Sequence, residues 1–403
     1  MQFFNNVINL SFTKLVWENM KSKFCLECSI MDEPMDYASS GVDIDEESKA
    51  ISELIESLDS STRKSGDFGA PVDLPGGFGG IIEFGNNRLV LATDGVGSKL
   101  QIANHLGQLG GVGIDCVAMN VNDLICVGAE PIAFVDYIAV PKTDSRVHGI
   151  IGKSLSEACR RANITLAGGE TATIPGIVKE LDLSGTALGW FPKGNEITGS
   201  NLREGDKLIG IPSSGLHSNG YSLVRAVVEK AGFEYTDEVP FNTNHEHRVI
   251  ERFPDYTDQL TLGEILLNPT RIYVDSIVNL LIEIRKGNKI CEHNDIKAIA
   301  HITGGGLSNL LRLHNSLGWE ISNPLPVHPE FLWIQQQGNV EDREMYRTFN
   351  MGVGMILAVS DIVAEKICEW LGQRVPGTEI IGEVKNHGRL VTHRIDNVRF
   401  DNY

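Results

Sequence analysis

The sequence predicts an α/β protein with two domains, and three observations support this. Strand-like and helix-like segments alternate along the chain. Its 403 residues exceed one typical domain. A turn-forming segment at 201–206 then separates two halves that each contain strand–loop–helix units. We therefore expect domains over 37–200 and 201–403, preceded by an extension, 1–36, that could be disordered.

The first half begins with a helix and continues with alternating strands and helices. Within 46–58, Ile51, Leu54 and Leu58 recur at helical spacing, and a Gly/Pro-rich stretch follows at 66–80. The elements that we then expect are a strand at 88–92, a helix at 111–127, a strand at 132–140, a helix at 149–162, and strands at 164–167 and 183–191.

The second half repeats this alternation. The expected elements are a strand at 207–211, a helix at 221–231, a strand at 296–301, a helix after the glycines at 304–306, a strand at 354–359 and a helix at 362–371. Residues 234–262 are polar and contain prolines, so we interpret them as an excursion.

Composition limits the function classes. The formal net charge of −18 and the pI near 5.0 argue against nucleic acid or an anionic membrane as a partner. No apolar run approaches the ~18 residues that a membrane span requires. The seven scattered cysteines favour a reduced, cytoplasmic compartment. Cys25 and Cys28 form a lone C-x-x-C, for which two incidental thiols are favoured over a redox or metal site.

Three acidic residues of the first half stand beside loop glycines. They are Asp94, Asp123 and Glu170, and Asp115 is a weaker further candidate. Each taken alone would be interpreted as a helix cap or a turn former. Three in one half favour a site for Mg²⁺ and phosphate, since Mg²⁺ prefers oxygen ligands that bridge to substrate phosphates.

Two glycine-containing loops of the first half predict an ATP site. After the strand at 88–92 the chain reads Asp94-Gly95-Val-Gly97-Ser98-Lys99, in which small residues allow backbone amides to approach a phosphate. Lys99 is interpreted as a phosphate contact, with a solvated surface lysine as the alternative. The second loop, with Gly76, Gly77 and Gly79, does not match a P-loop, and we interpret it as a flap over the nucleotide.

Two loops of the second half are rich in hydroxyls and glycines and precede helices. Free amides at a helix N-terminus stabilise a monophosphate, although an ordinary capped connection explains such loops equally well. His217 is the best-placed acid–base candidate, with a structural histidine as the alternative, whereas His301 is interpreted as packing or loop support. The candidate residues of the two loops are Ser214, Gly215, His217, Asn219, Thr303, Gly304 and Gly305.

These motifs together resemble the phosphoribosylformylglycinamidine cyclo-ligase (aminoimidazole ribonucleotide synthetase) family, from about residue 37 to near the C-terminus. The matching segments are Gly-Gly-Phe-Gly at 76–79, Asp-Gly-Val-Gly-Ser-Lys at 94–99, Asn-Asp at 122–123, Gly-Ala-Glu-Pro at 128–131, Gly-Gly-Glu-Thr at 168–171, Ser-Ser-Gly-Leu-His-Ser-Asn-Gly at 213–220, Asn-Pro-Thr-Arg-Ile-Tyr-Val at 268–274, His-Ile-Thr-Gly-Gly-Gly at 301–306 and Glu-Met-Tyr-Arg-Thr-Phe-Asn at 344–350.

The resemblance implies a ligase of purine biosynthesis that uses ATP and Mg²⁺. Such an enzyme closes the imidazole ring of formylglycinamidine ribonucleotide by way of a phosphorylated amide oxygen, and releases ADP and phosphate. It also implies a homodimer whose N-terminal domains contribute strands to an intersubunit β-barrel. By carry-over, Asp94, Asp123 and Glu170 would hold Mg²⁺ and the triphosphate with help from Lys99, and His217 and Asn219 would lie near the substrate.

Related enzymes share the acidic loops and remain alternatives. A selenophosphate synthetase would need a reactive cysteine or selenocysteine in the flap, and 66–90 contains no cysteine. Thiamine-monophosphate kinase and the hydrogenase-maturation dehydratase would share the nucleotide half but not the segments at 269–274 and 344–350. A non-catalytic nucleotide-binding scaffold is a further alternative, and ATP turnover with and without substrate separates these classes.

Overall fold

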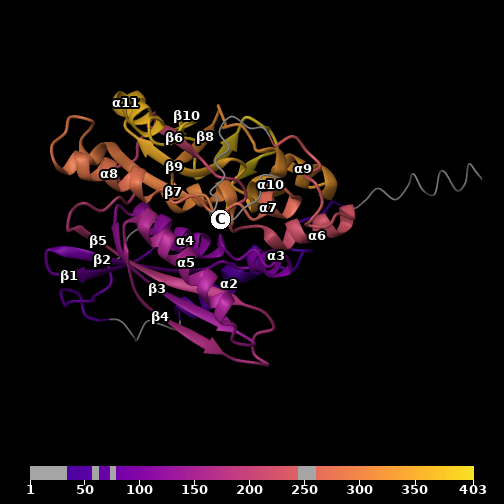
Figure 1. Ribbon diagram of the computed structural model, residues 1–403. Helices are drawn as coiled ribbons and strands as arrows, with labels where there is room; N and C mark the ends of the chain where they lie inside the picture. The colour runs from indigo at the N-terminus through magenta and orange to yellow at the C-terminus, as the bar shows by residue number, and fades with distance from the viewer. Residues whose placement is uncertain (1–33, 57–62, 73–78, 244–259) are drawn as a thin grey trace, which may run out of the picture.

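Two β-sheets, one from each half of the sequence, organise the computed structural model (Figure 1). The structure describes residues 34–56, 63–72, 79–243 and 260–403. Gly76, Gly77, Cys25 and Cys28 lie outside these ranges. The two sheets are separated in the chain by 193–206, a segment that contains the expected boundary at 200.

The N-terminal sheet has five strands in the order β1-β2-β5-β3-β4. The pair β3 and β4 is parallel and the other neighbours are antiparallel. The elements of this half are α2 (Ile44–Glu56), β1 (Gly80–Phe84), β2 (Asn87–Gly95), α3 (Lys99–Leu106), α4 (Val112–Cys126), β3 (Glu130–Val140), α5 (Ser145–Ala162), β4 (Thr165–Thr173) and β5 (Asp182–Pro192).

Helix α4 joins the two halves of the molecule. It contacts β2, β3 and β5 on one side and β7 and α8 of the C-terminal half on the other (Figure 1). Almost every residue of α4 is buried, including Asp115, Asn120 and Asn122. A helix enclosed on all sides is apolar around its whole circumference, and its few polar residues must find partners inside the protein.

The C-terminal sheet has seven strands in the order β12-β11-β8-β10-β6-β9-β7. Strands β7 and β9 are buried along their whole length; β9 has no polar side chain, whereas β7 also contains Lys297 and His301. The elements of this half are β6 (Lys207–Pro212), α6 (Tyr221–Ala231), α7 (Leu262–Leu266), α8 (Val274–Arg285), η2 (His293–Asp295), β7 (Ile296–His301), η3 (Gly306–Arg312), β8 (Gly318–Ile321), α9 (Pro329–Gly338), α10 (Asp342–Thr348), β9 (Val353–Val359), α11 (Asp361–Gly372), β10 (Glu379–Lys385), β11 (Val391–His393) and β12 (Arg399–Phe400).

The mixed α/β class is confirmed, and two expected elements differ. The strand expected at 164–167 continues to Thr173, because the glycines of Gly-Gly-Glu-Thr pair with β3 rather than form a loop. Glu170 is therefore a strand residue. The helix expected after Gly304–Gly306 is the 3₁₀ helix η3. Part of the expected excursion, 244–259, lies outside the described residues.

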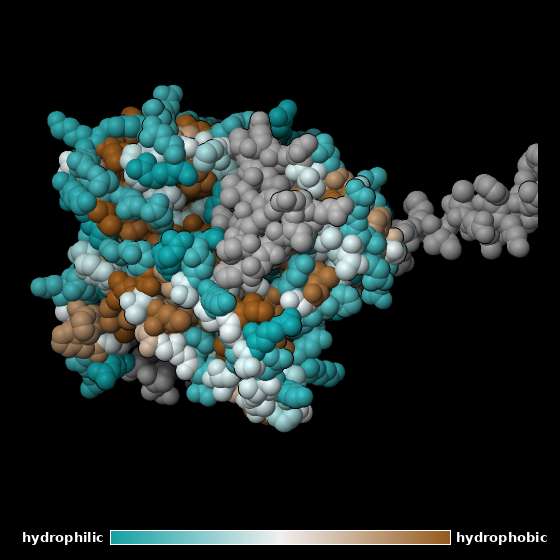
Figure 2. Space-filling view, in the orientation of Figure 1, coloured by the Kyte–Doolittle hydropathy of each residue, from teal (hydrophilic) through white to brown (hydrophobic). Residues whose placement is uncertain are grey.

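The surface that faces the viewer in Figure 2 is mostly polar, with apolar residues over the β1–β2 end of the N-terminal sheet. Phe68 and Phe84 are both exposed there, and their ring centroids are 5.3 Å apart. No helix among the described residues is long and apolar enough to cross a membrane.

Candidate active site

A cleft of about 610 Å³ lies where loops of the two halves meet. The N-terminal half contributes the loop that follows β2, and Gly97 in this loop has φ +69°, a conformation that favours glycine. The residues that line the cleft are Tyr37, Val42, Ile51, Ser52, Asp94, Gly95, Val96, Gly97, Ser98, Met119, Ser218, Asn219, Gly304, Arg312 and Tyr403. Segments that are far apart in the sequence therefore line one cleft, and the structure brings the predicted ATP loop and two predicted substrate residues, Asn219 and Gly304, together.

Asp94 and Asp123 form the acidic part of this region. Burial, and next the charge of Asp123, raise the pKa of Asp94 from 3.8 to about 6. The backbone N–H of Gly95 donates to Asp94 Oδ1 at 2.7 Å and opposes this shift. Two carboxylates that repel one another in a partly enclosed site suit a divalent cation, which would relieve their repulsion.

His301 holds the second of these carboxylates. Its Nδ1 lies 2.8 Å from Asp123 Oδ1, and its side chain is fully buried at the end of β7. The sequence identified His301 only as packing or loop support. Hydrogen bonds from neighbouring groups orient ligands at metal sites, so His301 is placed to fix the direction of the Asp123 carboxylate.

Glu170 is not brought to Asp94 within one chain. Asp94, Gly185, Asp136 and Gly169 are register partners across β2, β5, β3 and β4, so they share one face of the sheet. Glu170 follows Gly169 and therefore points to the opposite face. Among the described residues, no group of three His, Cys, Asp or Glu side chains could hold a metal ion. The expected three-carboxylate site is thus incomplete in the single chain.

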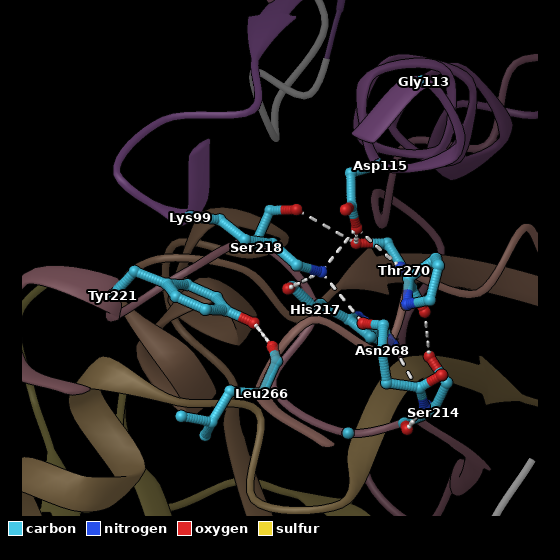
Figure 3. A network of polar contacts seen from close by, with 12 residues as sticks. Lys99, Gly113, Asp115, Ser214, His217, Ser218, Tyr221, Leu266, Asn268 and Thr270 are labelled. Carbon is cyan, nitrogen blue, oxygen red and sulfur yellow. Dashed lines mark hydrogen bonds and ion pairs between the residues drawn. The ribbon is translucent and has the colours of Figure 1, made fainter. Parts of the chain in front are cut away.

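Lys99 is placed differently from the expectation of a phosphate contact. Its side chain is fully buried, and its ammonium group donates to Asp115 Oδ1 and to the carbonyls of His217 and Asn268, each at 2.9 Å (Figure 3). An ammonium group has three N–H donors, and these bonds use all three. Burial lowers the pKa of Lys99, and the charge of Asp115 partly offsets this. Neither Lys99 nor its partner Asp115 reaches the cleft.

The ring of His217 is also enclosed. Its Nε2 accepts from the backbone N–H of Ser214 at 3.2 Å, and only 1% of the residue is exposed. Burial, with the nearby charges of His301 and Lys99, holds the pKa of His217 well below its ordinary value. The structural alternative for this histidine therefore fits the geometry better than a proton shuttle. Ser214 and Gly215 are fully enclosed as well, and the Gly215 carbonyl accepts from Asn350.

The remaining predicted residues with a described position are Gly79, Thr303, Gly304 and Gly305. Thr303 and Gly304 are partly exposed after the end of β7, and Gly305, with φ +91°, is the N-cap residue of η3. Gly79 packs tightly, because a Cβ at this position would lie 2.9 Å from Val90 Cγ1. Gly304 lines the cleft beside Asn219, and a Cβ at Gly304 would lie 3.4 Å from Asn219 Oδ1.

Arg312 and Tyr403 are cleft residues that the sequence did not indicate. The guanidinium group of Arg312 lies 5.0 Å from the ring centroid of Tyr403 and donates to its hydroxyl at 3.3 Å. The only sequence signal for Arg312 was that it is a basic residue at the end of the segment that follows Gly304–Gly306. Tyr403 lies more than ninety positions along the chain from Arg312, so periodicity alone could not pair the two.

Comparisons with known proteins agree with this architecture. The family model described as AIR synthase related protein, N-terminal domain, matches 76–191, and the corresponding C-terminal domain matches 203–394. The chain is 43% identical to phosphoribosylformylglycinamidine cyclo-ligase of Methanosarcina acetivorans over 85% of this chain and 93% of that protein. It is 40% identical to the cyclo-ligase of Methanocaldococcus jannaschii over 86% of this chain and 91% of that protein.

Solved structures of more distant proteins share the fold. HypE, a hydrogenase maturation protein solved in complex with ATP, has a TM-score of 0.52 at 17% identity and covers 80% of this chain and 83% of its own. Thiamine monophosphate kinase from Aquifex aeolicus has a TM-score of 0.51 at 15% identity and covers 86% of this chain and 97% of its own. At such low identity these similarities concern the fold alone. The two domain matches and the extended identity to cyclo-ligases show that this chain belongs to the AIR synthase family, among the phosphoribosylformylglycinamidine cyclo-ligases.

Proposed function

We propose that the protein catalyses ATP-dependent ring closure of formylglycinamidine ribonucleotide to aminoimidazole ribonucleotide, with release of ADP and phosphate, in purine biosynthesis. The observation that carries the proposal is the cleft in which the Asp94–Ser98 loop faces Asn219 and Gly304. It is supported by cyclo-ligases that are 39–43% identical over most of the chain. The cytoplasm is the proposed location, since the described cysteines are all free thiols.

The chemistry requires positioning and charge neutralisation. A formamide oxygen is a poor leaving group, so its phosphorylation by ATP precedes attack of the amidine nitrogen on the activated carbon, and phosphate then departs. In this proposal the backbone of 95–98 approaches the ATP phosphates, and Asn219 and Gly304 contact the ribonucleotide. The cleft encloses both substrates and limits access of water to the phosphorylated intermediate.

Asp94 and Asp123 are the proposed magnesium ligands. Their mutual repulsion in a partly buried site, seen in the raised pKa of Asp94, suits a hard divalent cation. When bound, Mg²⁺ would neutralise charge on the ATP phosphates. His301 would keep the Asp123 carboxylate oriented through its 2.8 Å contact.

The open face of the N-terminal sheet supports a homodimer. Leu91, Val135 and Tyr137 are each about 40% exposed on the face opposite α4. Apolar side chains that gather on one open sheet face mark an interaction surface, and we propose a second copy of the chain as its partner. Glu170 lies on this same face, so a metal role for Glu170 would depend on the second copy.

Light scattering tests the dimer. The wild-type mass at micromolar concentration should be twice the 44.2 kDa of the chain, and Val135→Asp should yield the monomer. The matched control is Ile362→Asp, which places the same charge at an apolar residue that is 88% exposed on α11. A monomeric wild type, or equal dissociation by both variants, would contradict the proposed face.

The reaction is tested by ADP release from Mg-ATP with and without formylglycinamidine ribonucleotide. Substrate-dependent ADP, formed at the same rate as aminoimidazole ribonucleotide, is the expected result. ADP release that is indifferent to this substrate would refute the proposal. Thiamine monophosphate and selenide should elicit no turnover.

A further inference from the structure

The buried Lys99 crosses from the N-terminal half to the C-terminal half of the molecule. It begins α3 directly after the Asp94–Ser98 loop, and two of its three acceptors are backbone carbonyls of the C-terminal half, those of His217 and Asn268 (Figure 3). All three acceptors are oxygens, an arrangement that fits a protonated ammonium group. Lys99 is therefore a buried, charged link between the two domains, and the residue before it, Ser98, lines the cleft.

Asp115 extends this link. Its Oδ1 accepts from Lys99 Nζ at 2.9 Å and from both the backbone N–H and the hydroxyl of Thr270 at 2.7 Å. The Thr270 hydroxyl lies 3.1 Å from Ser218 Oγ. The ion pair thus contacts two separate loops of the C-terminal half, 214–220 and 268–270. The 214–220 loop contributes Ser218 and Asn219 to the cleft.

His217 shows why the first of these loops needs support. Its φ of +61° lies in the left-handed region, which is unfavourable for a residue with a side chain. Two contacts hold this conformation: the bond from Lys99 to the His217 carbonyl and the bond from the Ser214 N–H to the His217 ring. The next two residues, Ser218 and Asn219, line the cleft. Their placement therefore depends on a strained residue that Lys99 contacts.

We propose that Lys99, anchored by Asp115, is a positioning residue that fixes the 214–220 loop against the Asp94–Ser98 loop and so sets Ser218 and Asn219 for the ribonucleotide substrate. That Ser218 and Asn219 contact the ribonucleotide substrate rests on the proposed function. Lys99 touches neither ATP nor substrate in this assignment. Lys99 acts through its hydrogen bond to the His217 carbonyl. A lysine with a purely structural role would stabilise the whole protein without a specific effect on the position of the 214–220 loop.

The principal test uses Lys99→Met, which keeps the chain length and removes the charge, and Asp115→Asn, which keeps the shape. The matched control is Arg285→Met, because Arg285 also makes a cation–carboxylate contact between the halves, 3.8 Å from Glu130 on β3, away from the 214–220 loop. Amide hydrogen exchange of 214–220 and steady-state kinetics are measured on all four proteins.

Both ion-pair variants should accelerate exchange in 214–220 and raise the KM for formylglycinamidine ribonucleotide by about tenfold to a hundredfold, as expected for a misplaced binding group. The KM for ATP should change much less, and Arg285→Met should leave both quantities near wild type. A double-mutant cycle of Lys99→Met with Asn219→Ala should be non-additive, since both changes act on the same contact.

The opposite results would overturn the proposal. They are unchanged exchange in 214–220, equal changes in both KM values, or additive effects of Lys99→Met and Asn219→Ala. If Lys99→Met fails to fold, Thr270→Val decides: it removes the hydroxyl contacts to Asp115 and Ser218 and should give the same exchange and KM pattern in a milder form. A wild type without substrate-dependent ADP release would refute the proposed function, and the exchange measurement would still decide the positioning role.

Discussion

Replacing Asp94 by asparagine should stabilise the metal-free protein and abolish its activity. The structure places this carboxylate in a partly buried site beside Asp123, and together these raise its pKa from 3.8 to about 6. Asparagine has the same shape, and its side-chain oxygen can still accept from the Gly95 N–H, which lies 2.7 Å from Asp94 Oδ1. The substitution therefore removes the unfavourable charge and keeps the local hydrogen bond.

The sign and size of the effect follow from the two pKa values. Asp94 binds its proton more tightly in the folded state, so the wild type loses stability as the pH rises from about 4 through about 6. A difference of about two pKa units corresponds to about 3 kcal/mol, and partial exposure to solvent reduces the expected gain to about 1–3 kcal/mol. Asparagine cannot ionise, so the gain should be full above pH 6 and should vanish near pH 4.

Urea unfolding at pH 8 and at pH 4, with a chelator present, measures this difference. Asp144→Asn is the matched control, because hydrogen bonds from the Arg146 and Val147 N–H groups hold the pKa of Asp144 below its ordinary value. Any change in the free energy of unfolding that Asp144→Asn causes at pH 8 should be a loss, whereas Asp94→Asn should give a gain. Destabilisation by Asp94→Asn at pH 8, or a gain that persists at pH 4, would refute the reasoning, and wild-type ADP release would exclude Asp94 as a metal ligand.

Three further predictions concern the cleft. Asp123→Asn should abolish substrate-dependent ADP release and leave thermal unfolding nearly unchanged; wild-type turnover would exclude Asp123 from the metal site. His301→Ala should lower the apparent affinity for Mg²⁺ by about tenfold to a hundredfold, because Asp123 loses its orienting partner; kinetics over a magnesium titration would show this, and an unchanged magnesium dependence would contradict it. Gly97→Ala should destabilise the protein by about 1–2 kcal/mol because φ is +69°, whereas Gly149→Ala within α5 should be neutral or stabilising; equal effects in urea unfolding would show that the backbone at Gly97 is not strained.

Much of the fold followed from local patterns. The helix over Tyr221–Ala231 and the strand over Ile296–His301 have the bounds that periodicity predicts. Other segments carried weaker signals: α8 (Val274–Arg285) and β10 (Glu379–Lys385) were not predicted. The glycines of β4 were interpreted as a loop, because glycine has a low intrinsic preference for strands. In the structure they pair with β3, and this partner cannot be inferred from local sequence.

The candidate site likewise contains residues that the sequence could indicate and residues whose surroundings it could not indicate. Residue types and spacing indicated the Asp94–Ser98 loop and Asp123, and residues 94–98 line the cleft. Their roles toward ATP and magnesium stay predictions. The enclosure of Lys99 and His217 could not be recognised, because a lysine at the end of a glycine turn has the same sequence signature whether it meets a phosphate or a buried carboxylate.

The sequence by itself determined the α/β class, the two-domain organisation, the glycine-containing acidic loops and, through its ordered motifs, the family. Tertiary structure alone decided which of those loops meet. It enclosed Lys99 with Asp115, separated Glu170 from Asp94 on opposite faces of one sheet, and brought His301 to Asp123 across 178 positions of chain. The physical reason is that local propensity is set by neighbouring residues, whereas burial and charge pairing are set by whichever distant segments the packed sheets and α4 bring into contact.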